Sequence, residues 1–206
     1  MAKIKLTKNE LKTQKDALKR FTRYLPTLEL KKKQLLLEIK KAQQEVERLK
    51  AENAKVEREV ANWVDVFADN DIDLQELVEI KELKTSTGNI AGIDIPVFEN
   101  LEFEDIDYDF YDTPLWVDAG IAVCKEQIRR KAEWEIAQRQ EELIQRELRT
   151  TIQRIKLFEE VKIPDARENI RAIQIFLGDQ QTAAVVRGKI AKAKIERKKQ
   201  EEASQV

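Results

Sequence analysis

Apolar residues recur at intervals of three and four through residues 1–67, where lysine and glutamate fill most other positions. The apolar positions form two columns with a seven-residue repeat, which is the a and d pattern of a coiled coil. The first column is Leu11, Leu18, Leu25, Ile39, Val46, Val60 and Phe67, and the second is Phe21, Leu28, Leu35, Ala42, Leu49, Val56 and Trp63. The pattern predicts one long helix over residues 1–67.

Polar residues and one proline modify this first helix. Thr7 and Glu10 have the spacing of a capping box, which predicts the start of the helix. Pro26 predicts a local kink, because proline removes a hydrogen bond inside a helix. Lys32 and Asn53 interrupt the first column; Asn53 either fixes the register of the coil or is simply tolerated there.

A second helical pattern follows Thr113 and Pro114, which are typical of an N-cap and a first helical position. Its apolar positions are Val117, Ile121, Cys124, Ile128, Ala132, Ile136, Leu143, Leu148, Ile152, Ile155, Ile163, Ala166, Ile170, Ile173 and Leu177. The gap from Ile155 to Ile163, followed by Pro164, predicts a bend or a straightened segment. Antiparallel pairing of the two helices would join residues whose numbers sum to about 182. Residues beyond about 174 would then have no partner and would form an overhang.

Residues 68–113 differ in character from both helical segments. Val78, Ile80 and residues 85–87 form a β-prone run, and Ile93, Ile95 and Val97 alternate in a second one. The segment from Gly88 to Gly92 predicts a five-residue loop between two strands. Pro96 restricts the second strand to an edge or a bulge.

These patterns together predict a mainly α fold, a long antiparallel two-helix coiled coil with a small β-hairpin head between the helices. The 206 residues are expected to form a single elongated domain, with the first helix at 1–67, the head at 68–113 and a C-terminal long helix with an overhanging tail at 114–206. The composition agrees, because 37% charged and 6% aromatic residues leave little material for a large globular core. Predicted core residues of the coil are Phe21, Leu28, Leu35, Leu49, Val56, Ile152, Ile155, Ile170 and Ile173.

Charge is segregated along the chain although the net charge is only −1. Residues 1–50 carry fifteen basic against six acidic side chains, whereas residues 65–112 carry two against fifteen. The tail from 187 to 206 is basic again. A solvated acidic face, or a surface that docks a basic partner, explains the acidic middle better than a catalytic or cation site does.

The residues that carry most enzyme chemistry are missing from the sequence. There is no histidine, and Cys124 is the single cysteine, so the usual general base and a thiolate metal site are both absent. No phosphate-binding loop motif occurs, and the basic ends lack a nucleic-acid-reading motif. We therefore expect no catalytic residues, cofactor, metal or nucleic acid. Without a signal peptide or a ~20-residue apolar run, we also expect a cytoplasmic protein that does not insert into a membrane.

Several segments together carry a family resemblance. They are LTKNELKTQKDALKRFTRYLPTLELKKKQLLLEI at the start, NIAGIDIPVF and YDFYDTPLWVDAGI in the middle, and TTIQRIKLFEEVKIPDARENIRAIQIFL near the end. In this order they resemble the D subunit of the V-type ATPase or ATP synthase, particularly its bacterial form. The resemblance implies an antiparallel coiled coil around a short β-hairpin.

The same resemblance implies a function and a set of partners. The chain would be the non-catalytic central rotor shaft that couples ATP hydrolysis or synthesis to translocation of protons or sodium ions. Its coiled-coil tip, with both termini, would lie in the bore of the catalytic hexamer of A and B subunits. The other end would join the F subunit and a funnel-shaped subunit that leads to the membrane rotor ring, so the chain would be peripheral on the cytoplasmic face.

Two groups of residues are predicted to contact these partners. The hairpin group is Ile93, Ile95, Val97 and Phe98, and the tail group is Arg187, Lys189, Lys192 and Lys194. Two other functions are alternatives: a prefoldin-like helix–hairpin–helix chaperone subunit, which shares the predicted architecture, and a cytoplasmic coiled-coil scaffold, which would not need the hairpin.

Overall fold

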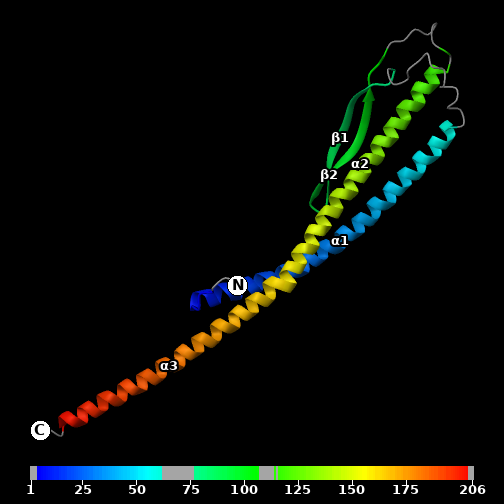
Figure 1. The fold of residues 1–206 in the computed structure, drawn as a ribbon. Coiled ribbons are helices and arrows are strands. Elements are labelled where there is room, and N and C mark those ends of the chain that lie inside the picture. The colour runs from blue at the N-terminus through cyan, green and yellow to red at the C-terminus, as the bar shows by residue number, and fades with distance from the viewer. Residues whose placement is uncertain (1–3, 62–76, 107–113, 115, 204–206) are drawn as a thin grey trace. The chain divides into compact units, whose positions relative to one another are not determined.

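The structure is a computed structural model that describes residues 4–61, 77–106, 114 and 116–203, with side chains described up to residue 199. Helix α1 (Lys8–Ala61) precedes strands β1 (Ile80–Ile90) and β2 (Ile93–Phe103), as Figure 1 shows. Helix α2 (Val117–Lys156), the π-helix η2 (Leu157–Lys162) and helix α3 (Ile163–Ala203) follow. The predicted fold class, mainly helical with a two-stranded antiparallel hairpin, is confirmed.

Two compact units make up the chain, and each is described by itself. One unit is Leu30–Ile152, and the other combines Met1–Glu29 with Gln153–Val206. That the whole chain behaves as one elongated domain stays a prediction. The predicted seam positions Trp63 and Phe67 and the predicted N-cap Thr113 lie outside the described residues.

The ends of the two predicted helices need small corrections. Thr7 caps α1, since its Oγ1 accepts a hydrogen bond from the Glu10 backbone N–H at 3.2 Å. The reciprocal half of the capping box is not formed, because the Glu10 carboxylate accepts from Gln14 instead. Helix α1 continues through Pro26 to Ala61. Helix α2 begins at Val117 and not at Pro114, whose carbonyl accepts the Val117 N–H at 3.0 Å.

The seam in the Leu30–Ile152 unit lies where the sequence columns indicate. Leu35 is 0% exposed and packs with Ile39, with Ile144 of α2 and with Ile95 of β2. Towards the end of α1, Val46 and Leu49 form a second cluster with residues of α2. Leucines between the columns face outward, so Leu37 is 63% exposed.

Polar contacts across this unit fix the pairing of the helices. Lys31 Nζ lies 2.6 Å from Glu147 Oε1, and Gln43 Nε2 donates to Glu141 Oε1 at 2.9 Å. The residue numbers in these two pairs sum to 178 and 184, on either side of the predicted 182. Helices α1 and α2 are therefore antiparallel in the predicted register.

Ile144 is only 1% exposed, although it is not among the predicted core residues. A heptad seam with one partner helix assigns the core position to its neighbour Leu143. In the structure Leu143 is half-buried and packs on the edge of the cluster, while Ile144 lies within it beside Ile95 of the hairpin. Because the hairpin adds a second partner, α2 buries a wider arc than a two-stranded coil requires.

The unit formed by residues 1–29 and 153–206 contains the irregular segment predicted near Pro164. The residues on the inward side of the helix here are Ile155, Phe158, Ile163 and Ala166, which are buried or half-buried. The interval from Phe158 to Ile163 is five residues long. Five residues of α-helix rotate by about 500°, which would move Ile163 about 140° away from Phe158. The π-helix Leu157–Lys162 corrects this, since the Ile163 N–H donates to the Phe158 carbonyl five residues earlier. Phe158 thereby faces Phe21 of α1, with ring centroids 5.2 Å apart.

The hairpin turn is shorter than predicted. Strands β1 and β2 pair from Ile80–Phe103 to Ile90–Ile93, so the loop is the pair Ala91 and Gly92 and not five residues. Both have positive φ, 53° and 79°, as a type I′ hairpin turn requires. Gly88 lies within β1, where a Cβ atom would come 2.9 Å from Val97 Cγ2. This glycine therefore serves close packing between strands and not the turn.

Substitution of two nearby leucines tests the register. Leu35→Ala should lower the free energy of unfolding by about 2–5 kcal/mol, because it leaves a cavity in the central cluster. The matched variant Leu37→Ala removes the same atoms from an exposed position and should change it by less than about 0.5 kcal/mol. Urea unfolding followed by circular dichroism measures both. Equal effects of the two substitutions would show that the register is wrong.

Candidate functional site

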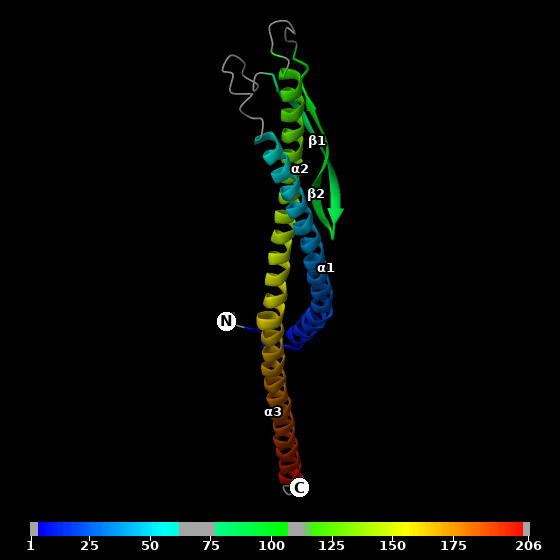
Figure 2. The ribbon, with the colours of Figure 1, turned by 90° about the vertical axis from the view of Figure 1, so that its right-hand side faces the viewer.

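The hairpin lies along the helices of the Leu30–Ile152 unit, as the two views in Figures 1 and 2 show. Near its turn, Ile95 enters the cluster formed by α1 and α2. Further along, the Pro96 carbonyl accepts a hydrogen bond from Gln140 Nε2 at 2.6 Å, and the Lys125 ammonium lies 5.6 Å from the centre of the Phe103 ring. Strand β2 is thus attached along α2 over most of its length.

This attachment limits the exposure of the predicted hairpin contact residues. Ile95 is 4% exposed, and Ile93 packs against the same core, so the surface of both is largely used within the chain. Val97 and Phe98 are half-buried. The more open apolar residues of the hairpin are Ile80 and Leu83 of β1, at 52% and 43% exposure. These two residues were not among the predicted contact residues, because the alternation of apolar residues does not reveal which strand faces the helices.

The second candidate surface is the C-terminal half of α3, here named the overhang and defined as residues 178–199. Every residue in it is exposed, and Figure 1 shows α3 continuing alone past the start of α1. Arg187, Lys189 and Lys194 form no ion pair within the described part of the chain, and Lys192 pairs loosely with Glu196 at 3.9 Å. The structure therefore presents all four predicted basic residues to the surroundings.

The overhang also exposes apolar side chains that the sequence analysis did not single out. They are Val185, Val186, Ile190 and Ile195. The sequence could have predicted them, because apolar residues continue past about residue 174, where the antiparallel pairing leaves the helix without a partner helix. An exposed surface that combines branched apolar side chains with cations is typical of a segment that another protein covers.

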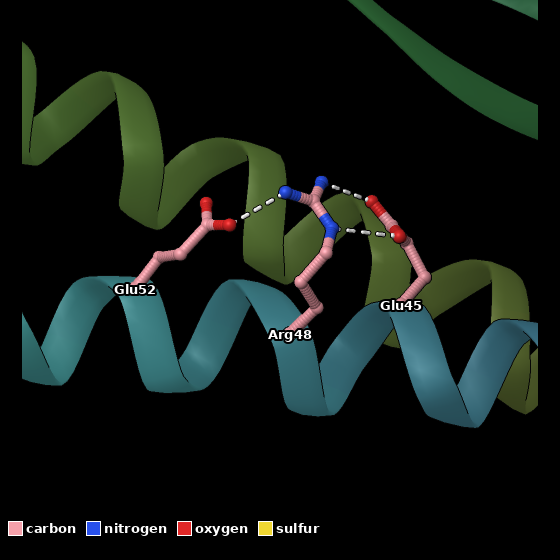
Figure 3. Close-up of polar contacts among 3 residues, drawn as sticks. All are labelled: Glu45, Arg48 and Glu52. Atoms are coloured by element: carbon pink, nitrogen blue, oxygen red, sulfur yellow. Dashed lines mark hydrogen bonds and ion pairs between the residues drawn. The ribbon is translucent and has the colours of Figure 1, made fainter.

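Charged side chains cover the outer face of α1. Figure 3 shows the Arg48 guanidinium between two carboxylates, 2.5 Å from Glu45 and 2.7 Å from Glu52. The hydrogen bond from Arg48 holds the pKa of Glu45 below its ordinary value, and the same bond raises the pKa of Arg48. Lys84 and Glu102 form a similar pair across the hairpin, and the pKa of Glu102 is lowered by its bond from Lys84. These groups stay ionised near neutral pH, so the outer surfaces remain hydrated.

Other candidate chemistry is limited in the part of the chain that the structure describes. Cys124 is half-buried, and its burial raises the pKa of the thiol, which reduces its reactivity. Among the described residues there is no group of three or more histidine, cysteine, aspartate or glutamate side chains placed to hold a metal ion. No described helix is both long and apolar enough to cross a membrane.

Comparison with known proteins identifies the family. Residues 10–193 match the family model that describes the D subunit of ATP synthase. The V-type ATP synthase D subunit of Borreliella burgdorferi is 48% identical over 198 residues, which cover 96% of this chain and 98% of that protein. The chain belongs to the family of V-type ATP synthase D subunits. The proteins of the same description from Chlamydia caviae and Chlamydia muridarum are 34% and 33% identical and cover at least 97% of each chain.

Membership of this family confirms the resemblance found in the sequence. It also disfavours the prefoldin-like chaperone and the coiled-coil scaffold. The matches cover nearly the full length of relatives that are described as V-type ATP synthase subunits. The candidate surfaces, the hairpin and the overhang, are therefore those of one subunit in a larger complex.

Two glycine substitutions test the local conformations of these surfaces. A Cβ atom added at Gly188 or at Gly92 would have no other atom within 4 Å, but only Gly92 has a positive φ. Gly188→Ala should stabilise the overhang helix by about 1 kcal/mol. Gly92→Ala should destabilise the hairpin turn by about 1–2 kcal/mol. Hydrogen exchange of the free chain, read over 180–199 and 80–103, should show slower exchange in the first variant and faster exchange in the second.

Proposed function

We propose that the chain is the non-catalytic central-stalk subunit of a V-type ATP synthase, a rotor shaft that couples ATP hydrolysis or synthesis to ion translocation. The ATP chemistry takes place in a hexamer of A and B subunits, and the ion, a proton or a sodium ion, crosses in the membrane part of the complex. Membership of the family of D subunits supports this function. The observation that carries it is the overhang, a helical segment that no other described part of the chain covers.

A rotor shaft must transmit torque without binding tightly at any one angle. The apolar seam between antiparallel helices supplies resistance to twisting, because rotation of one helix against the other would separate packed side chains. Exposed charges on the outer face form only weak contacts, individually ~0–1 kcal/mol, so a ring can turn past them. A single projecting helix is asymmetric and presses on different catalytic interfaces in turn.

The two candidate surfaces are assigned to opposite partners in this proposal. The overhang, with Arg187, Lys189, Lys192 and Lys194, lies in the bore of the catalytic hexamer and meets acidic lining residues there. The hairpin end joins the F subunit and the funnel-shaped subunit, and Val97 and Phe98 stay proposed contact residues. The complex holds the chain on the cytoplasmic face of the membrane as a peripheral subunit.

A reversible cross-link between shaft and ring tests rotation. Gln174 is exposed on α3, and Cys124 is the only native cysteine, so Cys124→Ser with Gln174→Cys places one reactive thiol on the shaft. A second cysteine is introduced in the facing part of a catalytic subunit of the assembled complex. Oxidation should stop ATP hydrolysis, and reduction should restore it, because a shaft joined to the ring cannot turn.

The control complex carries Gln174→Cys without a cysteine in the ring and should keep its activity under oxidising conditions. Hydrolysis at the full rate in a completely cross-linked complex would contradict the rotor function.

A further inference from the structure

Three exposed leucines lie close together on the outward side of α1. Leu30, Leu36 and Leu37 are 57%, 47% and 63% exposed, whereas their neighbour Leu35 is fully buried in the seam. Helix α2 packs in the same coil and is described over its whole length, yet it exposes no large apolar side chain to this degree. The exposed leucines are therefore a local feature of α1 and not a general property of the coil.

The leucines form one continuous surface with two exposed lysines. We define the leucine strip as Leu30, Lys33, Leu36, Leu37 and Lys40, in which neighbours are three or four residues apart and so lie on one side of the helix. The whole strip belongs to the Leu30–Ile152 unit. Single exposed apolar residues are common on protein surfaces, but a contiguous group indicates a surface that another molecule covers.

The hairpin does not cover the leucine strip. Its turn lies beside Gln34 and Glu38 of α1, which line one groove with Asn89, Ile90 and Ala91. Successive residues of an α-helix are about 100° apart, so Gln34 and Glu38 lie to one side of the strip. The hairpin therefore occupies a different face of α1, and the strip stays open.

The undescribed residues next to α2 and at the termini cannot cover the strip either. Leu37 is about level with Ile144 in the observed pairing of the helices, which is about 40 Å along α2 from Val117. The chain through residues 107–115 spans at most about 36 Å when it is extended. The three residues at each terminus span about 11 Å, which is less than the ~15 Å length of the strip.

Residues 62–76, which join the end of α1 to the start of β1, are also too short. Leu37 lies about 36 Å back along α1 from its last residue. The start of β1 lies beside Ile128 of α2, about 24 Å along that helix from the level of Leu37. A path to Leu37 and back to β1 would use the full extended length of the segment, about 58 Å. None of the segment would be left to lie along the strip, so another molecule must cover it.

The charge of the strip favours an acidic partner. Residues 30–41 contain five lysines and a single glutamate, and two of the lysines form ion pairs within the chain. Lys33 and Lys40, the two in the strip, form none with any described residue. Two such cations beside three leucines match a helix that carries apolar residues on one face and carboxylates next to them.

We propose that the leucine strip binds an acidic amphipathic helix of another subunit of the complex. That helix lies along α1, where Leu30 and Leu37 are two turns apart and match the seven-residue repeat of a partner helix. Its carboxylates lie beside Lys33 and Lys40. The inference uses the family membership of the chain and does not depend on the rotor function, so it is tested by binding and not by ATP turnover.

Two substitutions at one position test the apolar contact. Leu37→Gln and Leu37→Met both introduce a long unbranched side chain with a good helix propensity, but only glutamine is polar. The full chain is titrated by calorimetry with each other water-soluble subunit of the complex and with the assembled hexamer of A and B subunits. For one of these, Leu37→Gln should weaken binding at least about tenfold, and Leu37→Met less than about threefold. Equal affinities of the two variants for every subunit would overturn the proposal.

A charge reversal tests the acidic character of the partner. Lys33→Glu should weaken binding of the same subunit at least about tenfold at low salt and less at high salt, because salt screens exposed charges. Lys55 is also exposed on α1 but lies outside the strip, so Lys55→Glu should weaken binding less than about twofold. Equal binding by these two variants at low salt would contradict an acidic partner on the strip.

Cross-linking identifies the occupant. A photoreactive residue in place of Lys40 should link to an acidic helix of the subunit that the titrations identify. Sedimentation should give the same oligomeric state for the free chain and for its Leu37→Gln variant. Cross-links only to this chain, or a dimer that Leu37→Gln dissociates, would show that the chain covers the strip itself, and the proposal would be wrong.

Discussion

The structure depends on keeping one set of apolar residues of each helix turned toward its partner. An α-helix advances 3.6 residues per turn, so any change in the spacing of inward residues rotates the following segment away from the seam. The chain keeps the heptad spacing through α1 and meets one five-residue interval after Phe158. The π-helix Leu157–Lys162 absorbs the extra residue and keeps Ile163, Ala166 and Ile173 on the inward side. This irregularity preserves the seam and does not interrupt it.

The hairpin adds a second constraint to the Leu30–Ile152 unit. Through Ile95 and the bond from Gln140 to Pro96, β2 acts as a third packed element beside two helices. Its presence explains why α2 buries Ile144 and why the hairpin is less available to partners than an isolated head would be. Beyond Leu49, a groove lined by Lys50 of α1 and Trp134 of α2 lies between the two helices.

Local periodicity made the helices and their pairing predictable from the sequence. The repeat of apolar residues alone predicted the core columns that contain Leu35 and Leu49. It also predicted the antiparallel pairing, expressed as the sum of paired residue numbers. The turn at Ala91 and Gly92 was mispredicted, because Gly88 looks like a loop residue but is needed for its contact with Val97. The burial of Ile95 and the groove between Lys50 and Trp134 bring together residues far apart in the sequence, so no local pattern reveals them. The proposed function came from the family resemblance, because the sequence by itself offered no catalytic motif to argue from.

The central claim is that the π-helix holds Phe158 in the seam opposite Phe21. A double-mutant cycle tests it most directly, with Phe21→Ala and Phe158→Ala made singly and together and the free energy of unfolding measured for each. The account predicts a coupling energy of about 0.5–1.5 kcal/mol for this aromatic pair. The neighbouring Leu157 is exposed, so the cycle of Phe21→Ala with Leu157→Ala should be additive. Additive effects for Phe21 and Phe158 would contradict the account, because they would place Phe158 outside the seam.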